Sequence, residues 1–313
     1  MSYYLAVDGG GTKTDVLCAD ADGNIIGRGN SGPTNLTVTN VGAASFNLLE
    51  AIRQATEKLP DDKQFARMVM GLAGMDTPKE HSMAYSIFKS ALAPLPIDEM
   101  VLVNDCIIAL ANGSTAANRM VLISGTGTIC FGQSETGTVA RASGMDYLLT
   151  DQGSGYYIGR QVLREAVKSF DGRCEKSSLE QLVCQHFGIS SIADLKDQVY
   201  NPLLNKHEIA SLSTVCSEAV QSGDYRAKVI FEHACQELVN QAATVIERLG
   251  FSQITFDCVF AGSVLSVPFI KETVLTELTK KYKNLVAQYP TDPPVHGALR
   301  LAMSNQHIAE GTV

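Results

Sequence analysis

Apolar residues recur along the chain with two different periods, and the change between the periods predicts strands that alternate with helices. Three short β-rich runs come first and are separated by turns containing glycine and aspartate, which predicts a meander. The expected elements are strands over residues 3–8, 15–19 and 25–29, a helix over 41–59, a strand over 67–72, a helix over 83–92, a strand over 100–103 and a helix from about 105. This alternation is typical of an α/β fold, in which helices cover a sheet.

The pattern of strand, glycine turn and strand begins again near residue 119. Residues 119–124 and 129–132 read as strands, and a turn of glycine and threonine separates them. Because this order repeats the beginning of the chain, we expect two related domains that face each other. The region 155–287 is expected to be mainly helical, with one apolar strand over 255–260, and a last helix is expected over 296–303.

Length and composition limit the class of protein. A chain of 313 residues favours two domains, and a cleft between them is where a ligand site is expected first. With 45% hydrophobic and 19% charged residues the chain is neither disordered nor membrane-spanning, and the lack of a basic, cleavable N-terminal segment predicts a cytoplasmic protein. A net charge of −8 argues against general nucleic-acid binding. The eight scattered cysteines form no metal-binding motif and are expected to be buried and reduced.

The two glycine turns carry the candidate chemistry. Backbone amides in such turns can surround a polyphosphate, because glycine lets the chain approach the phosphate oxygens closely. The first turn contains Gly10, Gly11, Thr12, Lys13 and Thr14, and the second runs from Gly125 to Thr128. Two tight hairpins without a ligand are the alternative, but the pairing of the turns favours phosphate binding. Asp8, at the end of the first strand, is placed to hold Mg²⁺ through water.

Four short motifs follow one another along the chain, namely LAVDGGGTKT (5–14), VNDC (103–106), LISGTGT (122–128) and VFAGSV (259–264). They resemble motifs of the superfamily of sugar kinases, actin and heat-shock ATPases. Within that superfamily the chain resembles the BadF/BadG/BcrA/BcrD-type ATPases, and specifically their N-acetylglucosamine kinases. The resemblance implies an α/β fold of two ribonuclease H-like (actin-like ATPase) domains with a cleft between them. It places the first domain at residues 1–115 plus 296–313 and the second, with helical additions, at 116–295.

The resemblance also implies roles for the ATP-binding machinery. Asp8 corresponds to the carboxylate that organises Mg²⁺, and the two glycine turns correspond to the phosphate loops. Gly262 and Ser263 are expected to lie against the nucleotide. Asp105 resembles the catalytic base, and phosphoryl transfer needs a carboxylate that accepts the hydroxyl proton. Taken alone, an aspartate between a strand and a helix is more often an N-cap.

A further group of residues is expected to bind the sugar. Asn35 resembles the family's sugar-binding asparagine, although a turn asparagine is the simpler alternative. Asp151 resembles a carboxylate of the family that binds sugar hydroxyls. Gly144 resembles a glycine that lets the backbone approach the sugar closely. We assign Gly74, Gly125 and Thr126 to the same site.

The segment around Asp151 departs from the family's usual sequence. Met145 stands where the family usually has tryptophan, and Thr150 and Gln152 replace a glycine and a glutamate. Loss of an aromatic platform would widen the site toward a bulkier sugar such as N-acetylmuramic acid. The run Asp-Gln-Gly-Ser-Gly also occurs in glucosamine kinases, so the identity of the amino sugar stays open.

Together these features predict an ATP- and Mg²⁺-dependent kinase that acts as a homodimer on the 6-hydroxyl of N-acetylglucosamine. Its expected partners are the sugar and ATP, with no nucleic acid and no membrane. N-acetylmuramic acid is a further candidate substrate, and a glucosamine kinase is the alternative. An ATPase that activates a dehydratase or reductase would need cysteines spaced to hold an iron–sulfur cluster, and these are missing. A chaperone-like module would need a C-terminal peptide-binding extension, which we do not expect in this protein.

Overall fold

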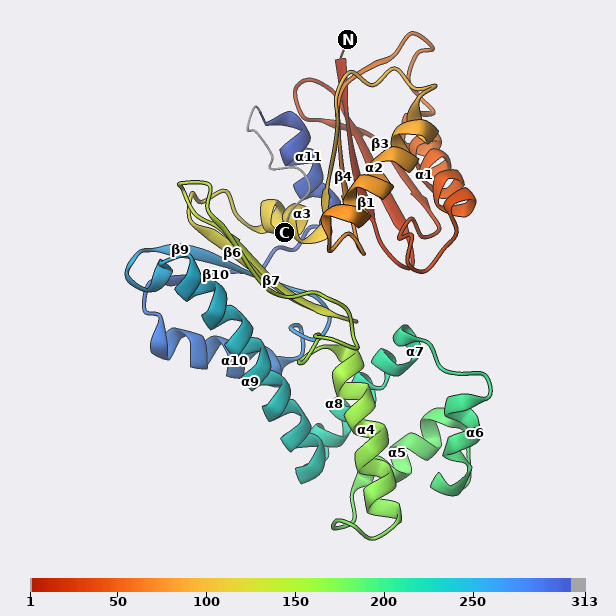
Figure 1. The fold of residues 1–313 in the computed structure, drawn as a ribbon, viewed down its shortest axis with the longest axis vertical. Coiled ribbons are helices and arrows are strands. Elements are labelled where there is room, and N and C mark those ends of the chain that lie inside the picture. The colour runs from red at the N-terminus through yellow and green to blue at the C-terminus, as the bar shows by residue number, and fades with distance from the viewer. Residues whose placement is uncertain (1, 305–313) are drawn as a thin grey trace. The chain divides into compact units, whose positions relative to one another are not determined.

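The computed structural model describes residues 2–304 and divides the chain into two compact units. Among the described residues, unit 1 comprises 2–119 and 288–304, and unit 2 comprises 120–287. Figure 1 shows a sheet with helices in each of them, which confirms the predicted α/β class. None of the described helices has the length and apolar character that crossing a bilayer requires.

Unit 1 is built on a five-stranded sheet whose strands alternate their side chains between two hydrophobic cores. β1 pairs with β2 in antiparallel and with β4 in parallel fashion. Leu5 and Val7 belong to one core, whereas Ala6 belongs to the other, as the two-residue period of a strand requires. The sheet order is β3 (Ile25–Ser31), β2 (Thr14–Ala19), β1 (Ser2–Gly9), β4 (Gln64–Leu72) and β5 (Met100–Asn104).

Two pairs of helices cover the two faces of this sheet. α1 (Val41–Thr56) and α2 (Pro78–Leu92) supply buried side chains to the core that contains Leu5. α3 (Asp105–Gly113) and α11 (Val295–Met303) supply the core that contains Ala6 (Figure 1). The helix near the C-terminus therefore packs on a sheet formed mostly by the first third of the chain.

Unit 2 repeats the strand order of unit 1. Its sheet runs β10 (Leu285–Gln288), β9 (Phe256–Ala261), β6 (Arg119–Ser124), β7 (Thr128–Gln133) and β8 (Val139–Ser143). In both sheets the strand before the glycine turn is central and the strand after it lies next to it. The sequence did not predict the two edge strands β8 and β10, because they are short and only partly buried.

Helices form the rest of unit 2 and enclose its large hydrophobic core. The longest helix, α9, contacts α10, α4 and the strands β7 and β8. The helices are α4 (Gly155–Phe170), α5 (Ser178–Phe187), α6 (Leu195–Tyr200), α7 (Lys206–Ser211), α8 (Ser213–Gln221), α9 (Tyr225–Arg248) and α10 (Pro268–Lys281), with 3₁₀ turns at Ile192–Asp194 and Phe251–Gln253. Six of the eight cysteines are buried, and Cys174 and Cys184 are half-buried.

Candidate active site

The first glycine turn joins β1 to β2 and supports the loop that carries Asn35. Gly10 N–H donates to the Lys13 carbonyl at 2.9 Å, which closes the turn. The Gly10 carbonyl in turn accepts hydrogen bonds from the backbone amides of Thr34 and Asn35, both at 3.2 Å. The glycine turn and the asparagine loop therefore form one hydrogen-bonded structure in unit 1.

The polar side chains of this turn are of two kinds: one is buried and holds the neighbouring loop, and the others are exposed. The Thr14 hydroxyl is buried and donates to the Gly32 carbonyl at 2.7 Å, so it holds the loop rather than facing outward. Thr12 is exposed. Lys13 forms an ion pair with Asp15 at 2.6 Å, and its side chain is 62% exposed.

Asp8 is the second-last residue of β1, and its position is electrostatically unfavourable for a carboxylate. Burial raises its pKa to about 7, with further contributions from the negative charges of Asp105 and Asp15, whereas Lys13 acts in the opposite direction. A carboxyl group surrounded by more negative than positive charge is where a divalent cation gains most. Among residues 2–304 no three His, Cys, Asp or Glu side chains are placed to share a metal, so a cation at Asp8 would need further oxygen ligands from water or phosphate.

Asp105 is the first residue of α3, but it is not the N-cap. The neighbouring Asn104 takes that role, since its Oδ1 accepts a hydrogen bond from Cys106 N–H at 3.0 Å. Asn104 Nδ2 also donates to the Met75 carbonyl at 3.0 Å, which ties the strand end to the loop after β4. The simpler interpretation of Asp105 is therefore wrong, and its half-buried carboxylate lies in the first turn of a helix.

Asn35 and Gly74 lie directly against each other. Asn35 Oδ1 accepts hydrogen bonds from Thr37 N–H and Thr37 Oγ1, both at 2.8 Å. A Cβ atom at Gly74 would lie only 2.5 Å from the same oxygen. Because the carbonyl side of this amide is engaged with Thr37, its Nδ2 donors are the atoms that remain to recognise an oxygen ligand.

The second glycine turn joins β6 to β7 and lies against two other segments of unit 2, the start of α4 and the segment at Gly262. Gly125 N–H donates to the Gly127 carbonyl at 3.0 Å, and the Gly125 carbonyl accepts from Gly155 N–H, the start of α4, at 2.7 Å. Gly262, with φ of 98°, lies so close that a Cβ atom there would be 2.2 Å from the Ser124 carbonyl oxygen. The structure thus brings Gly262 and Ser263 beside the second glycine turn.

Asp151 is anchored beneath this turn. Its Oδ1 accepts a hydrogen bond from Thr128 N–H at 3.3 Å, and its own N–H donates to Ser143 Oγ at 3.3 Å. Lys206 Nζ lies 3.5 Å from Asp151 Oδ2. Burial raises the pKa of Asp151, and the positive charge of Lys206 opposes that effect.

Backbone strain is concentrated in the same segment. Within residues 2–304, the non-glycine residues with positive φ are Ser143, Asp146 and Asp151, at 65°, 68° and 65°. Such conformations cost free energy and often occur at functional sites. Gly144 lies within this segment, and its carbonyl accepts a hydrogen bond from Arg141 Nη2. Met145 is 53% exposed, so the position of the expected tryptophan is open to solvent.

The predicted residues therefore fall into two sets. Unit 1 holds Asp8, the first glycine turn, Asn35, Gly74 and Asp105, and unit 2 holds the second turn, Gly144, Asp151, Gly262 and Ser263. Sequence reasoning missed Asn104 as the cap and Lys206 as the partner of Asp151. Asn104 could have been found, since asparagine is as good an N-cap as aspartate. Lys206 belongs to no motif and lies 55 residues beyond Asp151, so only the fold could pair them.

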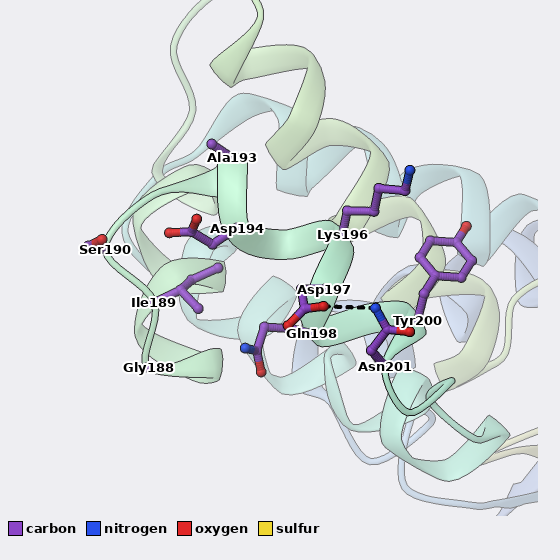
Figure 2. A pocket seen from close by; sticks show the side chains of 10 residues that line it. All are labelled: Gly188, Ile189, Ser190, Ala193, Asp194, Lys196, Asp197, Gln198, Tyr200 and Asn201. Carbon is purple, nitrogen blue, oxygen red and sulfur yellow. Dashed lines mark hydrogen bonds between the residues drawn. The ribbon is translucent and has the colours of Figure 1, made fainter.

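A hollow elsewhere in unit 2 is unrelated to these residues. It has a volume of about 660 Å³ and is formed by residues between Gly188 and Asn201, with Lys196, Asp197 and Tyr200 among them (Figure 2). Inside it, Asn201 Nδ2 donates to Asp197 Oδ1 at 2.8 Å. None of the residues predicted to bind ATP or sugar lines it, and the charged groups are those of an exposed polar surface.

Comparison with known proteins agrees with the motifs. The chain is 32% identical over 267 residues to the N-acetylmuramic acid/N-acetylglucosamine kinase of Clostridium acetobutylicum, which covers 85% of this chain and 86% of the relative. It is 29% identical over 315 residues to the N-acetyl-D-glucosamine kinase of Dictyostelium discoideum, covering 97% and 98% of the two chains. A candidate N-acetylglucosamine kinase from Chromobacterium violaceum has the same fold, with a TM-score of 0.76 at 21% identity over 97% of this chain and 99% of that one.

These likenesses confirm the predicted ribonuclease H-like fold, in which the two sheets share one strand order. The family model described as the BadF/BadG/BcrA/BcrD ATPase family matches residues 5–302, which is nearly all of the described chain. The protein belongs to the BadF/BadG/BcrA/BcrD ATPase family.

Proposed function

We propose that the protein transfers the γ-phosphoryl group of ATP to the 6-hydroxyl of N-acetylglucosamine or a closely related amino sugar. Two relatives that share most of its length are named as kinases of N-acetylglucosamine, one of them also of N-acetylmuramic acid, and the family is one of ATPases. The observation that carries the proposal is the position of Asp105. Asn104 rather than Asp105 is the N-cap of α3, and Asp105 stands directly after β5 in the first turn of this helix.

In this proposal Asp105 accepts the proton of the sugar hydroxyl as the oxygen attacks phosphorus. Phosphoryl transfer depends mainly on holding the two reactants in line and on a base that orients the hydroxyl. A helix terminus is a rigid support for such a base, and the buried hydrogen bonds of Asn104 fix the terminus.

The phosphate groups of ATP are assigned to the two glycine turns, with Gly262 and Ser263 beside the second. Asp8 fits a role in holding Mg²⁺ through water, because its carboxyl group is buried among negative charges that a cation would neutralise. Bound Mg²⁺ would supply charge neutralisation at the phosphate oxygens. Thr12 and Lys13 are exposed at the first turn and are proposed to contact ATP.

The sugar is assigned to Asn35, Gly74, Gly144, Asp151 and the turn residues Gly125 and Thr126. In this assignment Asn35 Nδ2 donates a hydrogen bond to a hydroxyl oxygen of the sugar, whereas the Asp151 carboxylate accepts hydrogen bonds from its hydroxyl groups. The two residues thus use both the acceptor and the donor capacity of sugar hydroxyls. The close contact between Gly74 and Asn35 leaves no room for a side chain there.

Met145 extends the proposal to N-acetylmuramic acid. Its exposed thioether side chain stands where the family usually has an aromatic platform, and it is flexible enough to make room for a larger substituent. The Clostridium acetobutylicum relative is named for both sugars. Glucosamine is the alternative substrate, because the Asp-Gln-Gly-Ser-Gly run is shared with kinases of that sugar.

A coupled kinase assay with glucosamine, N-acetylglucosamine, N-acetylmuramic acid and glucose tests the proposal. Phosphorus NMR of the product identifies the phosphorylated oxygen, and omission of Mg²⁺ tests the metal. Failure of every amino sugar to stimulate ATP turnover would refute a kinase and favour a regulatory ATP-binding protein. The homodimer and the cytoplasmic location also belong to this proposal, and analytical ultracentrifugation tests the first of them.

A further inference from the structure

The ammonium group of Lys206 lies between two carboxylates of unit 2. Its Nζ is 3.5 Å from Asp151 Oδ2 and forms a second ion pair with Asp146 Oδ1. The Asp151 side chain is 3% exposed, whereas that of Asp146 is 58% exposed and that of Lys206 is 29% exposed. Lys206 therefore connects a buried carboxylate to the protein surface.

The backbone of Lys206 is firmly fixed. It is the first residue of α7, whose N-terminus has a capping box in which Asn205 Oδ1 accepts from Glu208 N–H at 3.0 Å. In return Glu208 Oε2 accepts from Asn205 N–H at 2.7 Å. The ammonium also lies 5.5 Å from the centre of the Tyr147 ring, within the range of a cation–π contact. The cation is thus held in place before any ligand binds.

Asp151 needs a nearby positive charge. Desolvation raises the pKa of a buried carboxyl group, and a protonated carboxyl group loses one of the oxygen acceptors that sugar hydroxyls require. The charged groups that act on it are Lys206 from α7, which lowers its pKa, and Asp146 from the loop after β8, which raises it. The next residue, His207, contacts Thr126 Oγ1 at 3.4 Å instead.

The ion pair is also packed against the second glycine turn. A Cβ atom at Gly127 would lie 2.7 Å from Asp151 Oδ2 and 3.5 Å from Lys206 Nζ. The carboxylate therefore has contacts on two sides, the Thr128 amide at one oxygen and the Lys206 ammonium at the other.

We infer that Lys206 is a positioning residue, which holds the Asp151 carboxylate charged and oriented for the sugar. This inference rests on the proposed function in taking Asp151 as a sugar ligand. Lys206 itself need not contact the reacting atoms. It is set apart from the other lysine pairs of unit 2, such as Lys176 with Glu180, because its carboxylate partner is buried.

Three variants test this role in steady-state kinetics. Lys206→Met keeps most of the side-chain length but removes the charge, Lys206→Arg keeps the charge, and Lys176→Met removes an exposed lysine that pairs with Glu180 at 2.9 Å. For Lys206→Met we expect the KM for the sugar to rise about tenfold or more at pH 7. A tenfold rise corresponds to a loss of about 1.4 kcal/mol in the free energy of sugar binding. The KM for ATP should stay within about twofold, and Lys206→Arg should restore most of the sugar affinity.

The pH profile separates positioning from a general loss of structure. Without Lys206, Asp151 should ionise only at higher pH, so the ratio of the sugar KM of Lys206→Met to that of the wild type should fall as pH rises. Lys176→Met should follow the wild-type profile throughout. A sugar KM that is unchanged in Lys206→Met overturns the inference, and so does a selective rise in the KM for ATP, which would assign Lys206 to the nucleotide.

A titration of Asp151 gives a readout that does not depend on the reaction. Carbon-13 NMR of the aspartate carboxyl groups, with Asp151→Asn used for assignment, should show a higher pKa of Asp151 in Lys206→Met than in the wild type. It should be little changed in Lys206→Arg and Lys176→Met. If the wild-type protein phosphorylates no amino sugar, the proposed function fails, and this titration decides whether Lys206 controls Asp151.

Discussion

Asn104 caps helix α3 by accepting a hydrogen bond from Cys106 N–H at 3.0 Å. Asn104 and Asp105 stand next to each other at the end of β5, and either side chain could cap the helix. The contact shows that Asn104 is the N-cap. The asparagine accepts a hydrogen bond from the helix backbone and ties the helix to the Met75 carbonyl, and the aspartate that follows is the first residue of the helix. The N-cap and the proposed catalytic base are therefore adjacent residues.

Substitution of Asp105 should separate binding from turnover. Asp105→Asn keeps the shape of the side chain but cannot accept the hydroxyl proton, so we expect kcat to fall by about 10²-fold to 10⁴-fold. Calorimetric affinities for ATP and the sugar should change little. Comparable turnover in the variant would remove Asp105 from the role of base.

Asn104→Ala is the matched control, because it removes the cap and leaves the carboxylate in place. We expect it to lower the free energy of unfolding by about 1 kcal/mol, the usual effect of losing an N-cap. Asp105→Asn should not lower stability in this way, and thermal unfolding of the two variants checks the contrast.

Asp8 should make the ligand-free protein less stable as pH rises. Its folded pKa is raised to about 7 from an ordinary value of 3.8, so the folded state binds the proton more tightly than the unfolded state. This contribution to stability is complete below about pH 4 and is lost as pH rises through about 7. Asp8→Asn, which never ionises, should then be more stable than the wild type at pH 8 by up to about 4 kcal/mol.

Thermal unfolding without Mg²⁺ and ATP measures this effect at pH 4.5 and pH 8. The difference between Asp8→Asn and the wild type should be several degrees at pH 8 and much smaller at pH 4.5. Asp61→Asn, which changes an exposed carboxylate, should show no such trend. A variant that is less stable than the wild type at both pH values would contradict the prediction. Kinase activity should be lost in Asp8→Asn alone.

Local sequence signals predicted most of the fold. Central strands such as β1 and β6 are continuous runs of buried apolar residues, and each is followed by a glycine turn, so both position and partner follow from the sequence. The edge strands β8 and β10 were not predicted, because few of their side chains are buried and their sequences therefore show no hydrophobic period.

The candidate site could be proposed from the sequence only where its residues lie in motifs. Asp8, Asp105 and the glycine turns stand at strand ends and could be identified from local sequence. The pairing of Lys206 with Asp151 could not, because it depends on where α7 packs relative to the β6–β7 turn. The same holds for the contact of Gly262 with Ser124, which joins segments far apart in the chain.

Gly262 should tolerate no side chain. A Cβ atom there would lie 2.2 Å from the Ser124 carbonyl oxygen, and the φ of 98° is unfavourable for any other residue. We expect Gly262→Ala to lower the free energy of unfolding by more than about 2 kcal/mol and to raise the KM for ATP. Gly223→Ala separates the two causes, since Gly223 has φ of 86° but nothing within 4 Å. It should cost only about 1 kcal/mol and leave the KM for ATP unchanged, and equal effects in both variants would exclude the close contact as the cause.

Met145→Trp should change the preference between sugars. An aromatic ring at this half-exposed position would stack on a sugar face and bury more apolar surface than a thioether, which favours N-acetylglucosamine. The same ring would take up the space that a 3-O-lactyl group requires, so the kcat/KM for N-acetylmuramic acid should fall. We expect the ratio of the two kcat/KM values to change by about tenfold, a difference of about 1.4 kcal/mol in transition-state binding. Met145→Leu conserves volume without the ring and should keep the wild-type ratio. If Met145→Trp and Met145→Leu give the same ratio, residue 145 does not select the sugar.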